Sequence, residues 1–178
     1  NENNAKKNNI IVYPGDYRLN SLFELLRLSN IFSNQNKYTL VYAFRLPKLN
    51  HHIKDKVFKF LIKLLSRRNV LVLNHVKNIE LLYSESKCVI FPATRMTNKI
   101  DIPHSIIEPL FLKVHVLINN IQPLNELKKD LLFNFFSNEN LITAIEDTFT
   151  NNDLIGENFA YANLYYRNNN LSEYQKLY

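Results

Sequence analysis

The sequence is poor in glycine, cysteine and tryptophan: its 178 residues include two glycines, one cysteine and no tryptophan. The Gly-x-Gly-x-x-Gly dinucleotide fingerprint and the phosphate-binding P-loop each need several glycines, so that the backbone can approach a phosphate. Both motifs are therefore excluded. A chain with one cysteine cannot form an internal disulfide. That residue, Cys88, begins the apolar run CVIF and is predicted to be a buried strand residue in a reducing compartment.

Long hydrophobic runs are also missing. No stretch approaches the ~18–20 apolar residues of a membrane span, and the polar start NENNAKKNN is unlike a signal peptide. We therefore expect a cytoplasmic protein whose residues 1–9 are disordered. With 46% apolar and 21% charged residues the rest is ordinary for a soluble protein. Residues 10–178 are predicted to form a single domain.

Positive charge is in excess, with 22 Lys and Arg against 16 Asp and Glu, a formal net charge of +6. This balance favours anionic partners such as nucleotides, nucleic acid or an acidic membrane surface. An equally weighted alternative is that lysine and asparagine simply cover the surface. Nucleic-acid binding would rest on charge and tyrosines alone, since no recognition motif is present. We therefore expect no nucleic-acid partner.

Apolar runs alternate with segments of helical periodicity along the chain. Strands are predicted at residues 10–13, 38–44, 70–73, 88–91, 114–118 and 131–136. Helices are predicted at 22–32 (capped by Asn20 or Ser21), 53–67, 78–86, after Ser105, and from Asn138 onward with breaks near 151–152 and 167–170. Continuously apolar strands alternating with helices predict a doubly wound, Rossmann-like α/β fold. Its mostly parallel sheet would have about six strands and helices on both faces.

The segment 99–126, KIDIPHSIIEPLFLKVHVLINNIQPLNE, is the most informative. It predicts a loop, a short helix with Glu108, a buried strand and a polar loop, at the carboxyl edge where open α/β folds bind ligands. It resembles the donor-binding segment of retaining GT-B glycosyltransferases of group 1 (family 4). In many of these, Asp-Ile-Pro leads into Leu-Glu-Ala-Met-Ala and a strand like Pro-Val-Ile. The stretches IIVYPGDYR, NIELLYSESKCVIFPA and NNLSEYQKLY are similar to other parts of that domain.

The resemblance implies the C-terminal half of a GT-B glycosyltransferase, which binds a nucleotide-diphosphate sugar as substrate. The sugar would pass with retention to an acceptor glycan or lipid-linked acceptor held by a missing N-terminal domain, in glycan biosynthesis. No cofactor or metal is expected, and the isolated domain is expected to be inactive. Glu108 matches the second of the family's two glutamates and would bind the donor ribose. Ile100 stands at the first, which leaves its neighbour Asp101 as the catalytic candidate.

The remaining donor-binding candidates flank the same edge. The family's Arg-x4-Lys pair is not in place, so Arg18 and Arg45, which follow the first two strands, are the candidates for the diphosphate. His104 and Ser105 precede Glu108, where a helix N-terminus favours anions. Thr94 and Arg95, after the strand 88–91, are candidates for lining the nucleotide.

Each candidate also has a structural interpretation. Ser105 and Glu108 have the spacing of a capping box, and Pro109 is expected to confine Glu108 to the first turn of its helix. Surface arginines are common, and Asp101 could be an ordinary helix cap. His104 and Glu108 stand four residues apart, but no third metal ligand has a matching spacing.

Two broader alternatives stay open. The lost first glutamate and the lost Arg-x4-Lys pair also fit a non-catalytic glycosyltransferase-like scaffold or partner subunit. The helix 53–67 is basic and amphipathic, with Lys54, Lys56, Lys59, Lys63 and Arg67 beside Phe58, Leu61, Ile62 and Leu65. It would serve either for peripheral attachment to the inner face of an anionic membrane or as an outer helix with one face on the sheet and its lysines in water. We favour the outer helix.

Overall fold

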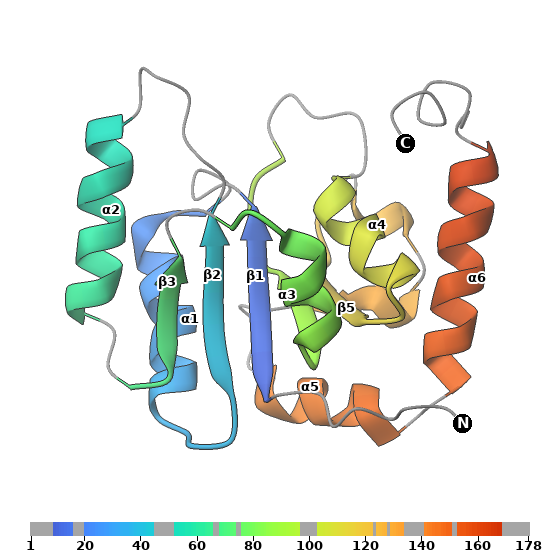
Figure 1. The fold of residues 1–178 in the computed structure, drawn as a ribbon, viewed down its shortest axis with the longest axis horizontal. Helices are drawn as coiled ribbons and strands as arrows, with labels where there is room; N and C mark the ends of the chain where they lie inside the picture. The colour runs from blue at the N-terminus through green and yellow to red at the C-terminus, as the bar shows by residue number, and fades with distance from the viewer. Residues whose placement is uncertain are drawn as a thin grey trace.

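A single six-stranded sheet runs through the molecule, with the strand order β3-β2-β1-β4-β5-β6. Figure 1 shows β3, β2 and β1 side by side. The computed structural model describes residues 9–15, 20–44, 52–65, 68–73, 76–96, 103–122, 124–127, 129–133, 141–150 and 153–168. The strands are β1 (Ile10–Gly15), β2 (Thr39–Phe44), β3 (Val70–Leu73), β4 (Cys88–Phe91), β5 (His115–Asn119) and β6 (Leu132–Phe133). All neighbouring strands pair in parallel, which confirms the predicted doubly wound α/β fold.

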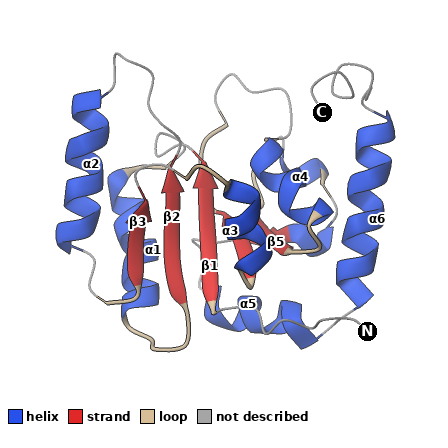
Figure 2. Cartoon of the chain, in the orientation of Figure 1, coloured by secondary structure: helices blue, strands red, loops and turns tan. Residues whose placement is uncertain are grey.

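Helices connect the strands from β1 to β5, as the alternation in the sequence predicted, and 3-10 turns lie between β5 and β6 (Figure 2). They are α1 (Leu22–Ser33), α2 (His52–Leu65), α3 (Ile79–Glu85), α4 (His104–Phe111), α5 (Leu141–Thr150) and α6 (Asp153–Asn168), with short 3-10 turns η3 (Leu124–Glu126) and η4 (Lys129–Leu131). The predicted break at 151–152 lies outside the described residues, between the end of α5 and the start of α6. The expected disorder of residues 1–9 falls almost wholly outside the described residues.

Two hydrophobic cores lie on opposite faces of the sheet. Because side chains alternate along a strand, Ile11 and Tyr13 of β1 join one core while Val12 between them joins the other. The first core includes apolar residues of α1, α2 and α5, and the second includes those of α3, α4 and α6. Cys88 is fully buried in the first core, as predicted. Because helices cover both faces of the sheet, successive side chains along a central strand are all buried and must be apolar.

The strand order reverses at β1. The chain runs from β1 through β2 to β3 on one side, then returns to β4 on the other side of β1. Helices after β1 and before β4 cover different faces, so the carboxyl ends of these two strands form the topological switch point, where open α/β sheets bind ligands. The N-termini of α1 and α4 lie at this same edge (Figure 1).

The start of α4 differs from the prediction. Its N-cap is Pro103, without a side-chain cap, so Ser105 is its second residue and the Ser105–Glu108 capping box does not form. Pro109 lies in the second turn, and the expectation that it confines Glu108 to the first turn was wrong. Tertiary packing decides here, because Pro109 and Leu110 are buried in the core on this face. The cost of one lost helical hydrogen bond is offset by that burial.

A capping box forms at α1 instead. The hydroxyl of the N-cap Ser21 accepts a hydrogen bond from the backbone N–H of Glu24, and the Glu24 carboxylate accepts one from the backbone N–H of Ser21. This confirms the predicted helix start. It also brings a carboxylate to the carboxyl edge of the sheet.

Candidate functional site

The carboxyl edge at the switch point is held together by a buried asparagine. Asn20, between β1 and α1, is 6% exposed. Its Oδ1 accepts a hydrogen bond of 2.7 Å from the Tyr13 hydroxyl, and its Nδ2 donates one of 2.7 Å to the carbonyl of Pro92. One side chain therefore joins the segment after β1 to the segment after β4.

A second buried amide fixes the same segment from the other side. Asn119 ends β5 and is 6% exposed. Its Nδ2 donates a hydrogen bond of 2.8 Å to the carbonyl of Ala93. The segment that leaves β4 is thus held between the ends of β1 and β5. A buried carbonyl without such a donor would cost about 1–3 kcal/mol, so both amides stabilise this path of the chain.

Glu24 adds a third connection to this edge. The hydroxyl of Thr94 donates a hydrogen bond of 3.0 Å to Glu24 Oε2, the oxygen that also accepts from the Ser21 N–H at 2.6 Å. A carboxylate at the first turn is favourable, because it meets the positive end of the helix dipole. The same carboxylate occupies a position where a bound anion would otherwise be stabilised. We call Tyr13, Asn20, Glu24, Thr94 and Asn119 the edge network.

A narrow strip of α4 beside this network is accessible to solvent, and it is formed by His104 and Glu108. His104 and Glu108 are four residues apart, so they share one side of the helix, and both are half-buried. The residues around them, Ser105, Ile106, Ile107, Pro109 and Leu110, are all buried. The Cα–Cβ bonds of a helix tilt toward its N-terminus, so the Glu108 side chain leaves α4 in the direction of the carboxyl edge.

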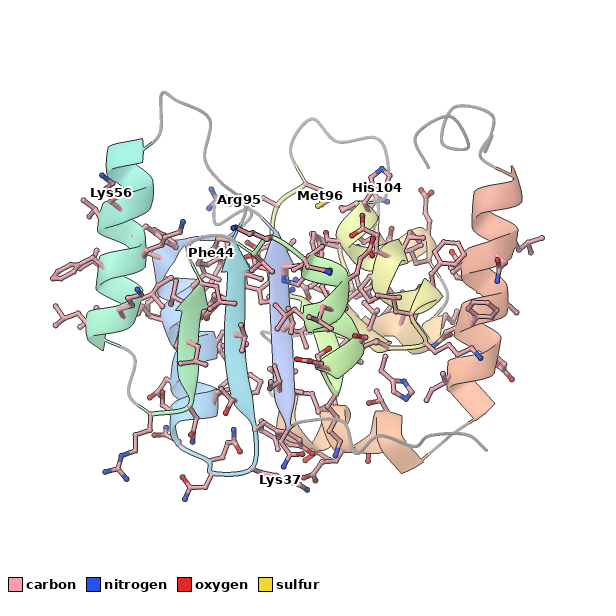
Figure 3. The ribbon with its side chains drawn as sticks, viewed as in Figure 1. Lys37, Phe44, Lys56, Arg95, Met96 and His104 are labelled. Carbon is pink, nitrogen blue, oxygen red and sulfur yellow. The ribbon has the colours of Figure 1, made fainter. Side chains whose placement is uncertain are left out.

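The structure brings together only part of the predicted site. Thr94 is half-buried within the edge network, and Arg95 is exposed beside it. Arg95, Met96 and His104 lie along the same upper edge in Figure 3. Ser105 is 3% exposed and belongs to the buried side of α4. The remaining predicted site residues, Arg18, Arg45 and Asp101, lie outside the described residues.

Four members of the edge network were missed by the sequence prediction: Tyr13, Asn20, Glu24 and Asn119. Ser21-x-x-Glu24 has the sequence signature of a capping box, which could have drawn attention to Glu24. Asn119 follows a buried strand, a position at which polar residues often reach the ligand-binding edge. Asn20 had no signal beyond its position before a helix, since its partner Pro92 is 72 residues away in the chain.

Metal binding was not expected, and the described residues contain no group of three His, Cys, Asp or Glu side chains that could hold a metal ion. His104 and Glu108 remain a pair. The edge network offers amide, hydroxyl and carboxylate groups, which suit hydrogen bonding to a polar organic ligand.

Three solved structures share this fold. TarM superposes with a TM-score of 0.60 and 16% identity, over 88% of this chain and 31% of TarM. The C-terminal domain of the glycosyl transferase group 1 family protein LpcC from Francisella tularensis superposes with a TM-score of 0.54 and 11% identity. The match covers 86% of this chain and 79% of that domain. A Listeria monocytogenes protein assigned as a UDP-N-acetylglucosamine 2-epimerase superposes with a TM-score of 0.53 and 17% identity. The match covers 88% of this chain and 40% of that protein.

These likenesses define the class of fold. The chain has the Rossmann-like α/β fold that these three structures share. It spans about a third of the length of TarM and most of the length of the isolated LpcC domain. The sequence itself matches no protein-family model and no curated protein.

Proposed function

We propose that this chain is the nucleotide-sugar-binding half of a retaining glycosyltransferase. The donor would lie across the carboxyl ends of β1 and β4, against the edge network and the accessible strip of α4. Support comes from the GT-B-like fold, from the general rule that open α/β sheets bind ligands at this edge, and from the buried amides of Asn20 and Asn119, which make the edge rigid.

The observation that carries the proposal is the position of Glu108. Its side chain is half-buried and accessible along one strip of an otherwise buried helix. A carboxylate has two acceptor oxygens, which suit the vicinal hydroxyls of a ribose. His104, one turn nearer the edge, would contact the donor beyond the ribose. In this proposal Thr94 and Arg95 line the nucleotide from the end of β4.

The reaction would be sugar transfer without a cofactor. The bond between the anomeric carbon and the diphosphate oxygen breaks, and a bond to an acceptor hydroxyl forms on the same face of the sugar. The acceptor proton leaves with the diphosphate. Arg18 and Arg45 would stabilise the diphosphate charge and Asp101 would orient the sugar in the oxocarbenium-like transition state. The acceptor, a glycan or a lipid-linked molecule, would be held by an N-terminal GT-B domain.

The test is calorimetric titration with the diphosphates of uridine, guanosine and adenosine. One of the three nucleoside diphosphates should bind saturably. Glu108→Ala should weaken that binding by about ten- to 100-fold, the equivalent of one or two charged hydrogen bonds. Glu85→Ala is the matched control, because Glu85 is an exposed carboxylate at the far end of α3. Unchanged affinity in Glu108→Ala would remove Glu108 from the site.

A non-catalytic scaffold is the second candidate, and Glu24 favours it. The carboxylate already fills the anion-binding end of α1 through its hydrogen bonds to Ser21 and Thr94. Repulsion between Glu24 and a diphosphate would weaken donor binding. Glu24→Gln keeps a hydrogen-bond acceptor and removes the charge. If this variant and the wild type, each joined to an N-terminal half, bind no nucleoside diphosphate at millimolar concentration, the scaffold function is correct.

A further inference from the structure

The outward face of α2 carries a row of exposed apolar residues. Val57, Phe60 and Leu64 are 52%, 61% and 64% exposed. Their spacing of three and four residues places them on one side of the helix. We call these three residues the α2 stripe. Singly exposed apolar residues are normal on a protein surface, but a contiguous row marks an interaction surface.

The α2 stripe is not needed to hold the helix on the domain. The side of α2 that packs against α1 and β3 carries Ile62, which is fully buried, and half-buried Phe58. Lys59 is also buried on this side, so the expectation that the helix keeps all its lysines in water was wrong. An ordinary outer helix places polar residues opposite its buried side. Here the opposite side carries Phe60 and Leu64.

Positive charge borders the stripe. Lys56 and Lys63 are exposed, and they stand four and three residues from Phe60, on the same side of the helix. The sequence of residues 56–65, KVFKFLIKLL, contains no acidic residue. A surface that combines an apolar row with charge of one sign is complementary to an anionic lipid surface, where acyl chains lie beneath phosphate groups.

The stripe lies apart from the candidate donor site. Helix α2 flanks β3, the edge strand of the sheet. Figure 3 shows Lys56 at one end of the molecule, away from Met96 and His104. A partner bound at α2 would therefore leave the carboxyl edge accessible.

We propose that the α2 stripe docks on an anionic lipid surface. Phe60 and Leu64 insert at the boundary between headgroups and acyl chains, while Lys56 and Lys63 bind lipid phosphates. This contact is peripheral, since no helix in the described part of the chain is long and apolar enough to cross a membrane. It does not depend on donor binding, so each proposal can fail without the other.

The first test uses vesicle co-sedimentation of the full chain. It should bind vesicles of phosphatidylcholine mixed with phosphatidylglycerol, and bind vesicles of phosphatidylcholine alone much more weakly. A Lys56→Gln/Lys63→Gln variant should bind about 25-fold more weakly, since each basic residue contributes about fivefold near an anionic surface. Phe60→Ser/Leu64→Ser should abolish binding. Phe23→Ser is the matched control, because Phe23 is 75% exposed on α1, and its binding should equal the wild type's.

The second test measures insertion and does not depend on affinity. The sequence has no tryptophan, so Phe60→Trp introduces a single indole into the stripe. Its emission should shift to the blue when anionic vesicles are added, while that of Phe23→Trp should not.

Several results would overturn the proposal. The first is wild-type protein that does not bind anionic vesicles. The second is a Phe60→Ser/Leu64→Ser variant that binds as tightly as the wild type. The third is an equal blue shift in the Phe60→Trp and Phe23→Trp variants. Sedimentation velocity supplies one more. If the wild type forms a dimer and does not bind vesicles, and if Phe60→Ser/Leu64→Ser abolishes the dimer, the α2 stripe binds a second copy of the chain instead.

Discussion

At the residue scale, Asn20 is the side chain that joins β1 to the segment after β4 at the switch point. Replacing it with alanine removes the hydrogen bond from the Tyr13 hydroxyl and the hydrogen bond to the Pro92 carbonyl. A buried hydrogen bond lost in this way costs about 1–3 kcal/mol. We expect Asn20→Ala to lower the free energy of unfolding by about 2–4 kcal/mol, measured by urea denaturation.

The control for Asn20 is Asn30→Ala, since Asn30 is an exposed asparagine in α1. Its effect on the free energy of unfolding should stay within about 0.5 kcal/mol. Equal losses in the two variants would show that the edge network does not stabilise the fold.

Tyr42 predicts how stability depends on alkaline pH. Its hydroxyl donates a hydrogen bond of 2.8 Å to the Leu25 carbonyl and lies 2.9 Å from the Ser29 hydroxyl. Burial raises the pKa of Tyr42 above its usual value, and the Ser29 hydrogen bond offsets this only in part. In the unfolded chain a tyrosine loses its proton near pH 10, whereas in the folded chain Tyr42 still holds it.

Above about pH 10 the unfolded chain therefore binds fewer protons than the folded chain, and the free energy of unfolding falls as pH rises. Tyr42→Phe removes this contribution. We expect the wild type to lose more stability than Tyr42→Phe between about pH 9 and 11, as measured by denaturant titration at each pH. Parallel stability curves for the two proteins would contradict the assignment.

At the scale of elements, α2 offers a direct comparison of its two sides. Ile62 is fully buried, whereas Phe60 is 61% exposed. Ile62→Ala should lower the free energy of unfolding by about 2–5 kcal/mol, through lost burial and the cavity left behind. Phe60→Ala should change it by less than about 0.5 kcal/mol. Thermal and urea unfolding of the two variants measures this, and a large loss in Phe60→Ala would mean that the stripe packs within the domain.

The elements also show what can be predicted from sequence. The strands β3 and β4 were predicted with the bounds that the structure has, because each is an uninterrupted apolar run of four residues. The start of α4 was not predicted correctly. Ser105 and Glu108 have capping-box spacing, yet burial of Pro109 and Leu110 sets where the helix begins. Local signals are reliable where they agree with packing, and packing decides where they conflict.

At the scale of the whole molecule, Cys88 reports global stability. It is fully buried in β4, which pairs with β1 and β5. A thiol there reacts only when the sheet opens, so its labelling rate should rise with urea in step with global unfolding. For a stability of at least about 5 kcal/mol, labelling in buffer should be slower than that of an exposed thiol by about 10³-fold or more.

Ser84→Cys provides the exposed thiol within the same protein, since Ser84 is exposed on α3. Its labelling should be fast and insensitive to urea, while Cys88 reacts slowly. Fast labelling of Cys88 without denaturant would mean that β4 opens locally and that the sheet does not unfold as one unit.

The sequence by itself determined the class of fold. Its apolar runs and helical periodicities depend on which residues are buried, and burial on both faces leaves a local pattern that can be read residue by residue. The resemblance of residues 99–126 also led to Glu108, which the structure places on the accessible strip of α4.

Only the tertiary structure decided how the edge network is joined and which side of α2 is buried. Asn20 meets a carbonyl 72 residues away, and Asn119 meets one 26 residues away. No local pattern encodes such pairs, because they arise where strands distant in the sequence end side by side. The α2 stripe is equally a tertiary fact: a helix with apolar residues on two sides can bury only one of them against the sheet, and packing chose Ile62 and left Phe60 in solvent.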